Sequence, residues 1–284
     1  MRFVKGHGTE NDFVILPDPD GVLDLTPAAV ARLCDRRAGI GADGVMRVVR
    51  TKVADSGAPA VRGAEPSGEA EWFMDYRNAD GSVAEMCGNG IRVFARYLVE
   101  AGLAAPGEWD VATRAGPRRV SLGPSGDVRV EMGEATLLGP GEASLGGTVF
   151  QGERVSVGNP HLACRVDGPV TALDLSRAPG FDPAVFPDGV NVEFFRVVGE
   201  RHVEMRVYER GSGETRSCGT GTVAVAAAAA RELADPGTIG APEASVWTVD
   251  VPGGRVNVAL HPRAASLTGP AVLVAEGETL PGWI

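Results

Sequence analysis

The sequence predicts an α+β protein of two pseudo-symmetric lobes, each a curled, mostly antiparallel sheet or barrel around a central helix. Two observations support this prediction. A Cys-Gly-x-Gly sequence occurs at Cys87 and again at Cys218, and each copy opens a helix-like run. The segments before each copy also follow one order: a strand, an asparagine-bearing turn, a strand, a proline-started helix and further strands. Such a duplication would bring two equivalent helix N-termini together at a pseudo-twofold cleft.

Composition narrows the class of protein. The chain has 284 residues, enough for one large or two modest domains. Its 39 Gly and 20 Pro favour many short strands and tight turns over a helical bundle. The formal charge of -10 argues against nucleic acid or an anionic membrane as a main partner. With four cysteines, no apolar signal segment and no run long enough to span a bilayer, we expect a cytoplasmic protein with reduced thiols.

In the first half of the chain, short apolar or alternating runs predict strands at 2–5, 13–16, 45–49, 71–76, 120–122 and 128–132. A turn is expected at Gly6–Gly8, and Thr26–Pro27 has the N-cap and proline of a helix start. Residues 51–70 are small and polar, which predicts an exposed insertion. After Gly90, apolar residues recur with helical spacing until Gly102, so an amphipathic helix is expected there.

The second half repeats this order, with strands predicted at 155–157, 162–166, 189–194, 203–207, 246–251, 256–260 and 271–274. Asp182–Pro183 repeats the proline-started helix. The helix after Cys218 is apolar on every side, so other structure must enclose it. We expect residues 1–122 to form the N-terminal lobe and residues 123–269 the C-terminal lobe.

The two cysteine motifs suggest acid–base chemistry. A cysteine at a helix N-terminus lies beside unpaired N–H groups and the positive end of the dipole, which lowers its pKa from about 8.5 to roughly 3.5–7.5. Two such ends facing one another would bind a carboxylate. A thiolate and a thiol on opposite faces of an α-carbon suit a two-base racemisation. No lysine lies near either motif and no zinc-type spacing occurs, so neither a cofactor nor a metal is expected.

Two further groups lie near these motifs. Glu209 and Arg210 precede the second cysteine: Arg210 would clamp a second carboxylate, and Glu209 would bind an ammonium or set thiol protonation, unless the two form only an exposed charge pair. His161 either belongs to a turn or lines the cleft. A buried-thiol turn and a redox pair are the alternatives for the cysteines, although the Cys-x-x-Cys spacing of disulfide oxidoreductases is absent.

Several motifs run in order along nearly the whole chain: Lys5–Gly8, Asn11–Phe13, Gly39–Asp43, Asn78–Ser82, Met86–Arg92, Gly158–His161, Asn191, Glu209–Gly211 and Ser217–Gly221. Together they resemble the diaminopimelate epimerase family, cofactor-independent isomerases that interconvert LL- and meso-diaminopimelate in lysine and peptidoglycan-precursor biosynthesis. The resemblance implies two lobes that close on the substrate, with the last strand, within 270–284, returning to the first lobe.

The resemblance also implies roles for individual residues. Cys87 and Cys218 would be the acid/base pair, tuned by His161 and Glu209. Backbone amides would hold the reacting carboxylate, at Gly88, Asn89, Gly219 and Thr220. The rest of the substrate would be bound by Asn11, Asn78, Asn159, Asn191, Glu209 and Arg210.

Two of the chain's departures from the family pattern bear on the site and on assembly. Thr9–Glu10 replaces the commoner Leu-Gly. Ala275 stands where some relatives carry an aromatic residue that packs between subunits, which weakens the case for a homodimer.

Other functions on this scaffold remain as alternatives. Proline racemases and hydroxyproline epimerases resemble this family and also use two cysteines, but their substrates lack a second amino-acid head group. Arg210 and four asparagines therefore favour diaminopimelate. A non-catalytic thiol redox or binding protein is the alternative from another class.

Overall fold

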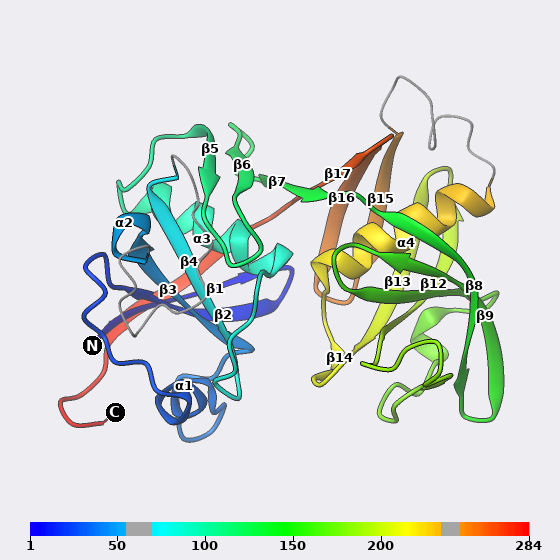
Figure 1. The fold of residues 1–284 in the computed structure, drawn as a ribbon, viewed down its shortest axis with the longest axis horizontal. Helices are drawn as coiled ribbons and strands as arrows, with labels where there is room; N and C mark the ends of the chain where they lie inside the picture. The colour runs from blue at the N-terminus through cyan, green and yellow to red at the C-terminus, as the bar shows by residue number, and fades with distance from the viewer. Residues whose placement is uncertain (55–69, 234–244, 284) are drawn as a thin grey trace. The chain divides into compact units, whose positions relative to one another are not determined.

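The computed structural model describes residues 1–54, 70–233 and 245–283, and Figure 1 shows its course. It is a sheet-dominated α+β protein, as predicted. The chain forms two compact units: Met1–Val130 with Pro270–Ile284, and Glu131–Gly269. Most of the predicted insertion at 51–70 lies outside the described residues; its first four form the short helix α2 (Thr51–Ala54). No described helix is both long and apolar enough to cross a membrane.

The sheet of the first unit has the strands β1 (Arg2–Gly8), β2 (Asn11–Pro17), β3 (Gly44–Arg50), β4 (Trp72–Asn78) and β18 (Val272–Glu278). Their order is β18-β1-β2-β3-β4, and every pair is antiparallel except β2–β3. Pairing of β18 with β1 places the last strand beside the first. The order is open among the described strands, so this sheet is not a closed barrel.

A meander in the first part of the chain is formed by β5 (Gly107–Val111), β6 (Arg118–Leu122) and the start of β7 (Val128–Gly133). The β6–β7 pair is the hairpin predicted from alternating apolar residues. The helix α1 (Pro27–Cys34) begins as predicted, with Thr26 Oγ1 accepting from the Ala29 amide at 3.2 Å.

The longer helix α3 (Gly88–Glu100) presents its apolar residues to the sheet and contacts β1, β2 and β18. Ile91, Phe94 and Leu98 are fully buried, which confirms the predicted amphipathic face. This packing fixes the N-terminal end of α3 relative to the start of β2.

The β1–β2 turn is not at Gly6–Gly8, where the sequence prediction placed it. It is formed by Thr9 and Glu10, which have φ angles of 50° and 60°. Positive φ at both loop residues matches the twist of a two-residue hairpin, but it favours glycine or asparagine, so this pair gave no turn signal. Gly6 instead permits close packing, because a Cβ there would lie 2.8 Å from Val93 Cγ1.

The second unit contains β8 (Thr136–Leu145), β9 (Thr148–Ser156), β10 (Pro160–Arg165), β11 (Gly180–Phe181), β12 (Asn191–Gly199), β13 (His202–Glu209), β14 (Gly213–Thr215), β15 (Ser245–Val251), β16 (Gly254–His261) and β17 (Ala264–Gly269). These strands run in the order β11-β8-β9-β10-β12-β13-β15-β16-β17, with β14 paired to β13. The pairs β10–β12 and β13–β15 are parallel, and the remaining pairs in this order are antiparallel. Among the described strands, this sheet also does not close into a barrel.

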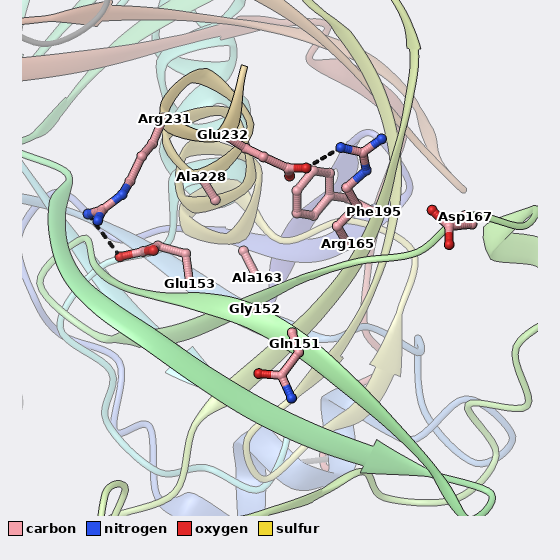
Figure 2. A pocket seen from close by; sticks show the side chains of 10 residues that line it. All are labelled: Gln151, Gly152, Glu153, Ala163, Arg165, Asp167, Phe195, Ala228, Arg231 and Glu232. Atoms are coloured by element: carbon pink, nitrogen blue, oxygen red, sulfur yellow. Dashed lines mark hydrogen bonds and ion pairs between the residues drawn. The ribbon is translucent and has the colours of Figure 1, made fainter. Parts of the chain in front are cut away.

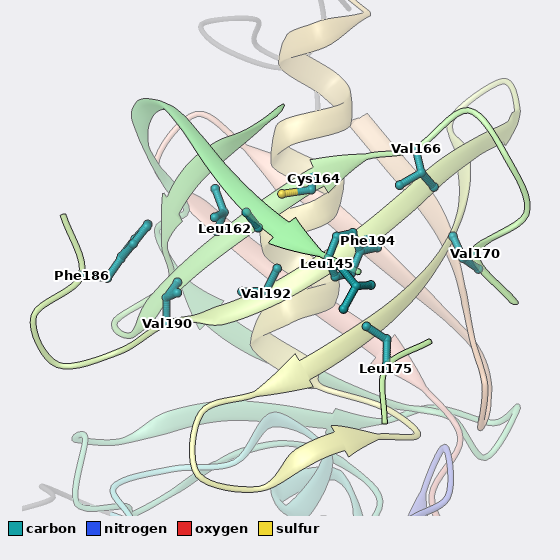
Figure 3. Packing of buried hydrophobic residues seen from close by; sticks show 11 residues of the cluster. Leu145, Leu162, Cys164, Val166, Val170, Leu175, Phe186, Val190, Val192 and Phe194 are labelled. Carbon is teal, nitrogen blue, oxygen red and sulfur yellow. The ribbon is translucent and has the colours of Figure 1, made fainter. Parts of the chain in front are cut away.

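The helix α4 (Gly219–Glu232) is enclosed, as its composition predicted. Every residue from Gly221 to Ala230 is buried, and the helix contacts strands on several sides, including β9, β10, β12, β13 and β16. The run of alanines and valines lets these strands approach closely. On the opposite side of β10 and β12, Phe194, Leu162 and Cys164 belong to an apolar cluster (Figure 3).

The helix predicted from Asp182–Pro183 does not form. Asp182 Oδ1 accepts from the Ala184 amide at 2.8 Å, and the Phe186 amide bonds to the Asp182 carbonyl at 3.0 Å, which makes a single turn. Pro187 ends it, because the residue before a proline is disfavoured in helical conformation. Besides α4 and this turn, the described part of the second unit has one helical segment, a three-residue 3-10 turn at Val170–Ala172.

Candidate active site

Cys87 is the N-cap residue of α3. Its backbone is extended (φ -138°, ψ 119°), and its Sγ accepts from the Gly90 amide at 3.3 Å. The sulfur therefore takes the place that a serine or aspartate oxygen usually fills. The N–H groups of Gly88 and Asn89 belong to the first turn of the helix, where donors point along the helix axis toward its N-terminal end. Such a helix end is suited to bind an anion.

Asn11 and Asn89, both predicted site residues, lie against this cysteine. Asn11 Oδ1 is 3.7 Å from Cys87 Sγ and accepts from Asn89 Nδ2 at 3.3 Å. Asn11 Nδ2 donates to Asp43 Oδ2 at 2.7 Å, and Arg36 pairs with the other oxygen of Asp43 at 2.6 Å. We call Cys87, Asn11 and Asn89 the Cys87 cluster; its thiol faces neutral amides.

Arg92 was not predicted as a separate site residue, although it ends the first cysteine motif. It is fully buried on α3, and its NH2 donates to Thr9 Oγ1 at 3.1 Å. Burial lowers the pKa of Arg92 to about 10, while attraction to Cys87 and Asp127 opposes this change. Its neighbours on the same helix face include Asn89 and Arg96, which are polar, so the sequence carried no signal that Arg92 is buried.

Asn78 lies apart from these contacts in the described structure. It ends β4, is exposed, and donates through Nδ2 to Ser82 Oγ at 3.0 Å. Its backbone amide also bonds to the Ser82 carbonyl at 2.9 Å. The hydrogen bonds found for Asn78 therefore close a turn.

Cys218 is the N-cap of α4 in the same conformation (φ -123°, ψ 117°). Its Sγ accepts from the Gly221 amide at 3.4 Å and lies 3.5 Å from Thr220 Oγ1. The first-turn N–H groups of Gly219 and Thr220 again point along the helix axis toward its N-terminal end.

Glu209, at the end of β13, is the carboxylate next to Cys218. It hydrogen-bonds to the Thr215 hydroxyl and to the Cys218 thiol. Burial raises the pKa of Glu209. Burial first, and then the negative potential of Glu209 and Glu193, raise the pKa of Cys218 well above its ordinary value. The lowered pKa that the helix terminus led us to expect is therefore wrong for Cys218, because burial and two carboxyl groups outweigh the dipole.

His161 and Asn159 connect to the same thiol. His161 Nδ1 is 2.7 Å from Glu193 Oε1, and its Nε2 is 3.0 Å from Asn159 Oδ1. Asn159 Nδ2 donates to Thr220 Oγ1 at 3.3 Å. We call this group the Cys218 cluster: Cys218, Thr220, Glu209, Asn159, His161 and Glu193. Glu193 was not predicted; a charged residue inside a strand with buried neighbours on both sides was its only sequence signal.

Arg210 and Asn191 contact one another. Asn191 Oδ1 accepts from the Arg210 backbone amide at 2.9 Å, and Arg210 NH1 donates to the Asp188 carbonyl at 2.9 Å. The Arg210 side chain is exposed, so part of its guanidinium can meet a ligand. Asn191 pairs with His161 in the parallel register of β10 and β12, which places it next to the Cys218 cluster.

A cavity of about 670 Å³ in the second unit contains none of the predicted site residues. It lies at the C-terminal end of α4, beside Ala228, and ion pairs Arg165–Glu232 and Arg231–Glu153 cross it (Figure 2). The 14 residues of α4 separate the two helix ends by about 20 Å. Both arginines of its lining are already paired with carboxylates, and Asp167 adds a further acidic group, so the cavity does not favour an anionic ligand.

Comparison with known proteins decides the family. The family model described as diaminopimelate epimerase matches residues 3–138 and 154–274. A diaminopimelate epimerase from Thermobifida fusca is 61% identical over 278 residues, covering 98% of this chain and 97% of the relative. One from Streptomyces coelicolor is 55% identical over 288 residues, covering 100% and 97%. The chain belongs to the diaminopimelate epimerase family. The resemblance found in the sequence motifs is thereby confirmed.

Solved structures of other proteins share the fold of this diaminopimelate epimerase family member. A PhzF-family phenazine biosynthesis protein from Bacillus anthracis matches with a TM-score of 0.65 and 17% identity, over 99% of both chains. A hydroxyproline epimerase from Agrobacterium vitis matches with a TM-score of 0.62 and 14% identity, over 98% of this chain and 91% of that one. At such identities the likeness concerns the fold alone.

Proposed function

We propose that this chain is a cofactor-independent isomerase that interconverts LL- and meso-diaminopimelate. One observation carries the proposal: full-length membership of the diaminopimelate epimerase family in a chain that keeps a cysteine N-cap on both α3 and α4. The rivals do not share this support, because the hydroxyproline epimerase is similar only in fold.

The reaction needs one base and one acid on opposite faces of the α-carbon. One cysteine thiolate removes the α-proton, and the electron pair left on carbon spreads into the α-carboxylate. First-turn amides of Gly88, Asn89, Gly219 and Thr220 would stabilise that developing charge. The other cysteine gives its proton to the opposite face of the carbon and becomes the thiolate, so protons and charge balance.

Burial and two nearby carboxyl groups keep the proton on Cys218 before substrate binds. We therefore assign to Cys218 the role of acid in the first turnover, and to Cys87 the role of base. The first turnover then begins with proton removal by Cys87 and ends with a thiolate at Cys218.

The rest of the substrate would be bound by a set of polar side chains. Arg210 would pair with the distal carboxylate, and Glu209 would receive an ammonium group. The amide side chains that complete the set are Asn11, Asn78, Asn159 and Asn191. His161 and Glu209 would tune proton transfer at Cys218. We also propose that the protein acts in the cytoplasm and can form a homodimer, although Ala275 weakens the case for that dimer.

The test is incubation of the purified, reduced protein with LL-diaminopimelate in deuterium oxide without added cofactor. We expect meso product with deuterium at the inverted α-carbon, followed by NMR and chiral chromatography. L-Proline and trans-4-hydroxy-L-proline are the matched controls and should not react. Inversion of either control without reaction of diaminopimelate would replace this proposal with the rival substrate class.

A further inference from the structure

Glu193 is a fully buried carboxyl group that the proposed reaction does not use directly. It lies on β12 with a side chain that is 0% exposed, and its Oε1 is 2.7 Å from Nδ1 of His161, also 0% exposed. An ionisable side chain is rarely held so deeply unless its partner compensates for the lost hydration. His161 is that partner.

The same carboxyl group lies under the first turn of α4. A Cβ built on Gly221 would be 2.7 Å from Glu193 Oε1 and 3.3 Å from its Cγ. Glycine at 221 therefore lets the carboxyl group reach this turn. The Gly221 amide is also the donor to Cys218 Sγ, at 3.4 Å, so Glu193 contacts the residue that caps the catalytic thiol.

A continuous path of hydrogen-bonding groups leads from Glu193 to Cys218. If His161 donates through both ring nitrogens, to Glu193 and to Asn159 Oδ1, then Asn159 Nδ2 is left to donate to Thr220 Oγ1. The Thr220 hydroxyl hydrogen is then free to point at Cys218 Sγ, 3.5 Å away. All donors in the path point toward the sulfur, which is the direction that stabilises a thiolate there.

We propose that Glu193 is a positioning residue that holds His161 as an imidazolium and thereby orients Asn159 and Thr220 toward the Cys218 sulfur. This inference rests on the proposed function. When Cys218 has given its proton to the α-carbon, the Thr220 hydroxyl donates to the new thiolate. Burial raises the pKa of the Glu193 carboxyl, and attraction to His161 opposes this rise. The Glu193 charge alone would disfavour a thiolate at Cys218, but paired with an imidazolium it adds no net buried charge beside the sulfur.

The other titratable groups near this pair come from three elements. Glu209 faces it from β13 and Cys218 from the N-terminal end of α4, whereas Cys164 lies behind it, on the opposite face of β10. The first two belong to the Cys218 cluster. Cys164 has a pKa raised to about 12, first by burial and then by Glu193, so it stays a neutral thiol.

The experiment compares the wild-type enzyme with Glu193→Gln, which keeps the shape and removes the charge. Nitrogen-15 NMR of the imidazole, assigned with His161→Gln, should show a doubly protonated His161 ring at pH 7 in the wild type and a neutral ring in Glu193→Gln. In the same variant kcat for diaminopimelate should fall about 10–100-fold, with KM changed less than about 3-fold, as for loss of a supporting hydrogen bond.

Two further variants keep the test decisive. Glu204→Gln removes a carboxylate that pairs with Arg196 elsewhere in the same sheet and should leave both readouts unchanged. Glu193→Asp keeps the charge on a shorter side chain. It should therefore keep the imidazolium signal, and its kcat should fall less than that of Glu193→Gln. If Glu193→Gln does not fold, Glu193→Asp and the wild type are compared instead.

A neutral His161 in the wild type, or unchanged kcat in folded Glu193→Gln, overturns the inference. The NMR readout does not depend on turnover, so it stands even if diaminopimelate proves not to be the substrate.

Discussion

The Cys87 and Cys218 clusters have the same backbone and different electrostatics. Each cysteine is an extended N-cap whose sulfur accepts from the amide three residues later, at 3.3 Å and 3.4 Å. Cys87 is half-buried and faces the amides of Asn11 and Asn89, whereas Cys218 is buried and faces Glu209. A repeated motif thus sets where a thiol lies, and the surrounding strands set whether it keeps its proton.

The side chains that hold the two clusters in place differ as well. Asn11 is held by Asp43, within an ion-pair group at the surface that also includes Arg36, Asp12 and Lys5. The Cys218 cluster is held from inside by the buried His161–Glu193 pair. Salt screens the first kind of support far more than the second.

Removal of either sulfur should have the largest effect on activity, because each cluster supplies one of the two proton-transfer groups. Cys87→Ser and Cys218→Ser should each lower epimerisation by about 10³-fold or more, because serine is too weak an acid or base to replace a thiol here. Each variant keeps one cysteine. That cysteine should still exchange the α-proton of one epimer, the one whose α-hydrogen faces the remaining sulfur. Deuterium exchange measured separately from LL and meso substrate therefore distinguishes the two variants.

Equal exchange from both epimers in both variants would contradict a separate role for each sulfur. Far-UV circular dichroism and the melting temperature of each variant are the controls for folding.

Thiol alkylation compares the reactivity of Cys87 and Cys218 without substrate. At pH 7 iodoacetamide should modify Cys87 at least about 10²-fold faster than Cys218, because the raised pKa of Cys218 leaves little thiolate and burial limits access. Peptide mapping over time measures both rates. Cys34 and Cys164 are internal controls: burial raises their pKa values to about 11 and about 12, so both should stay unmodified in the folded protein.

Alkylation of Cys218 at the rate of Cys87 would contradict the assignment of Cys218 as the acid of the first turnover. The same measurement in urea, where all four thiols are exposed, gives the unfolded reference.

The smallest expected effect concerns the surface support of the Cys87 cluster. Burial alone would raise the pKa of Asp12, but hydrogen bonds from Arg36 and Lys5 lower it from 3.8 to about 2. Ionised Asp12 therefore stabilises the folded state by about 2 kcal/mol at pH above about 4, and this is lost as pH falls toward 2. Denaturant unfolding should show wild type more stable than Asp12→Asn at pH 6, with a smaller difference at pH 3.

A difference that stays constant between these pH values would mean that the Asp12 effect is packing and not charge. Asp110→Asn, in the exposed pair with Arg119, is the matched control and should change stability much less.

Local sequence was sufficient for the features that depend on neighbouring residues. Cys-Gly-x-Gly followed by an apolar run predicted both capped helices, and the composition of α4 predicted its enclosure. Thr26–Pro27 predicted the start of α1 for the same reason. The Asp182–Pro183 signal failed because Pro187, four residues on, limits any helix there to one turn.

Features set by distant parts of the chain were not predictable. Glu193 meets His161 because β12 pairs in parallel with β10, and alternation within one strand cannot indicate which strand lies beside it. The pKa of Cys218 depends on burial by strands far along the sequence, whereas the sequence showed only the helix end. The turn at Thr9–Glu10 has positive φ at residues that seldom adopt it, so its conformation follows from the β1–β2 pairing.

The pairing of β18 with β1 has a consequence for synthesis of the protein. The second unit is one continuous segment, Glu131–Gly269, so all its strands are available once that segment has left the ribosome. The first unit begins earlier but lacks its edge strand until residues 272–278 emerge. During translation β1 therefore exposes an unpaired edge, which is a site for wrong pairing, and the chain's last strand covers it.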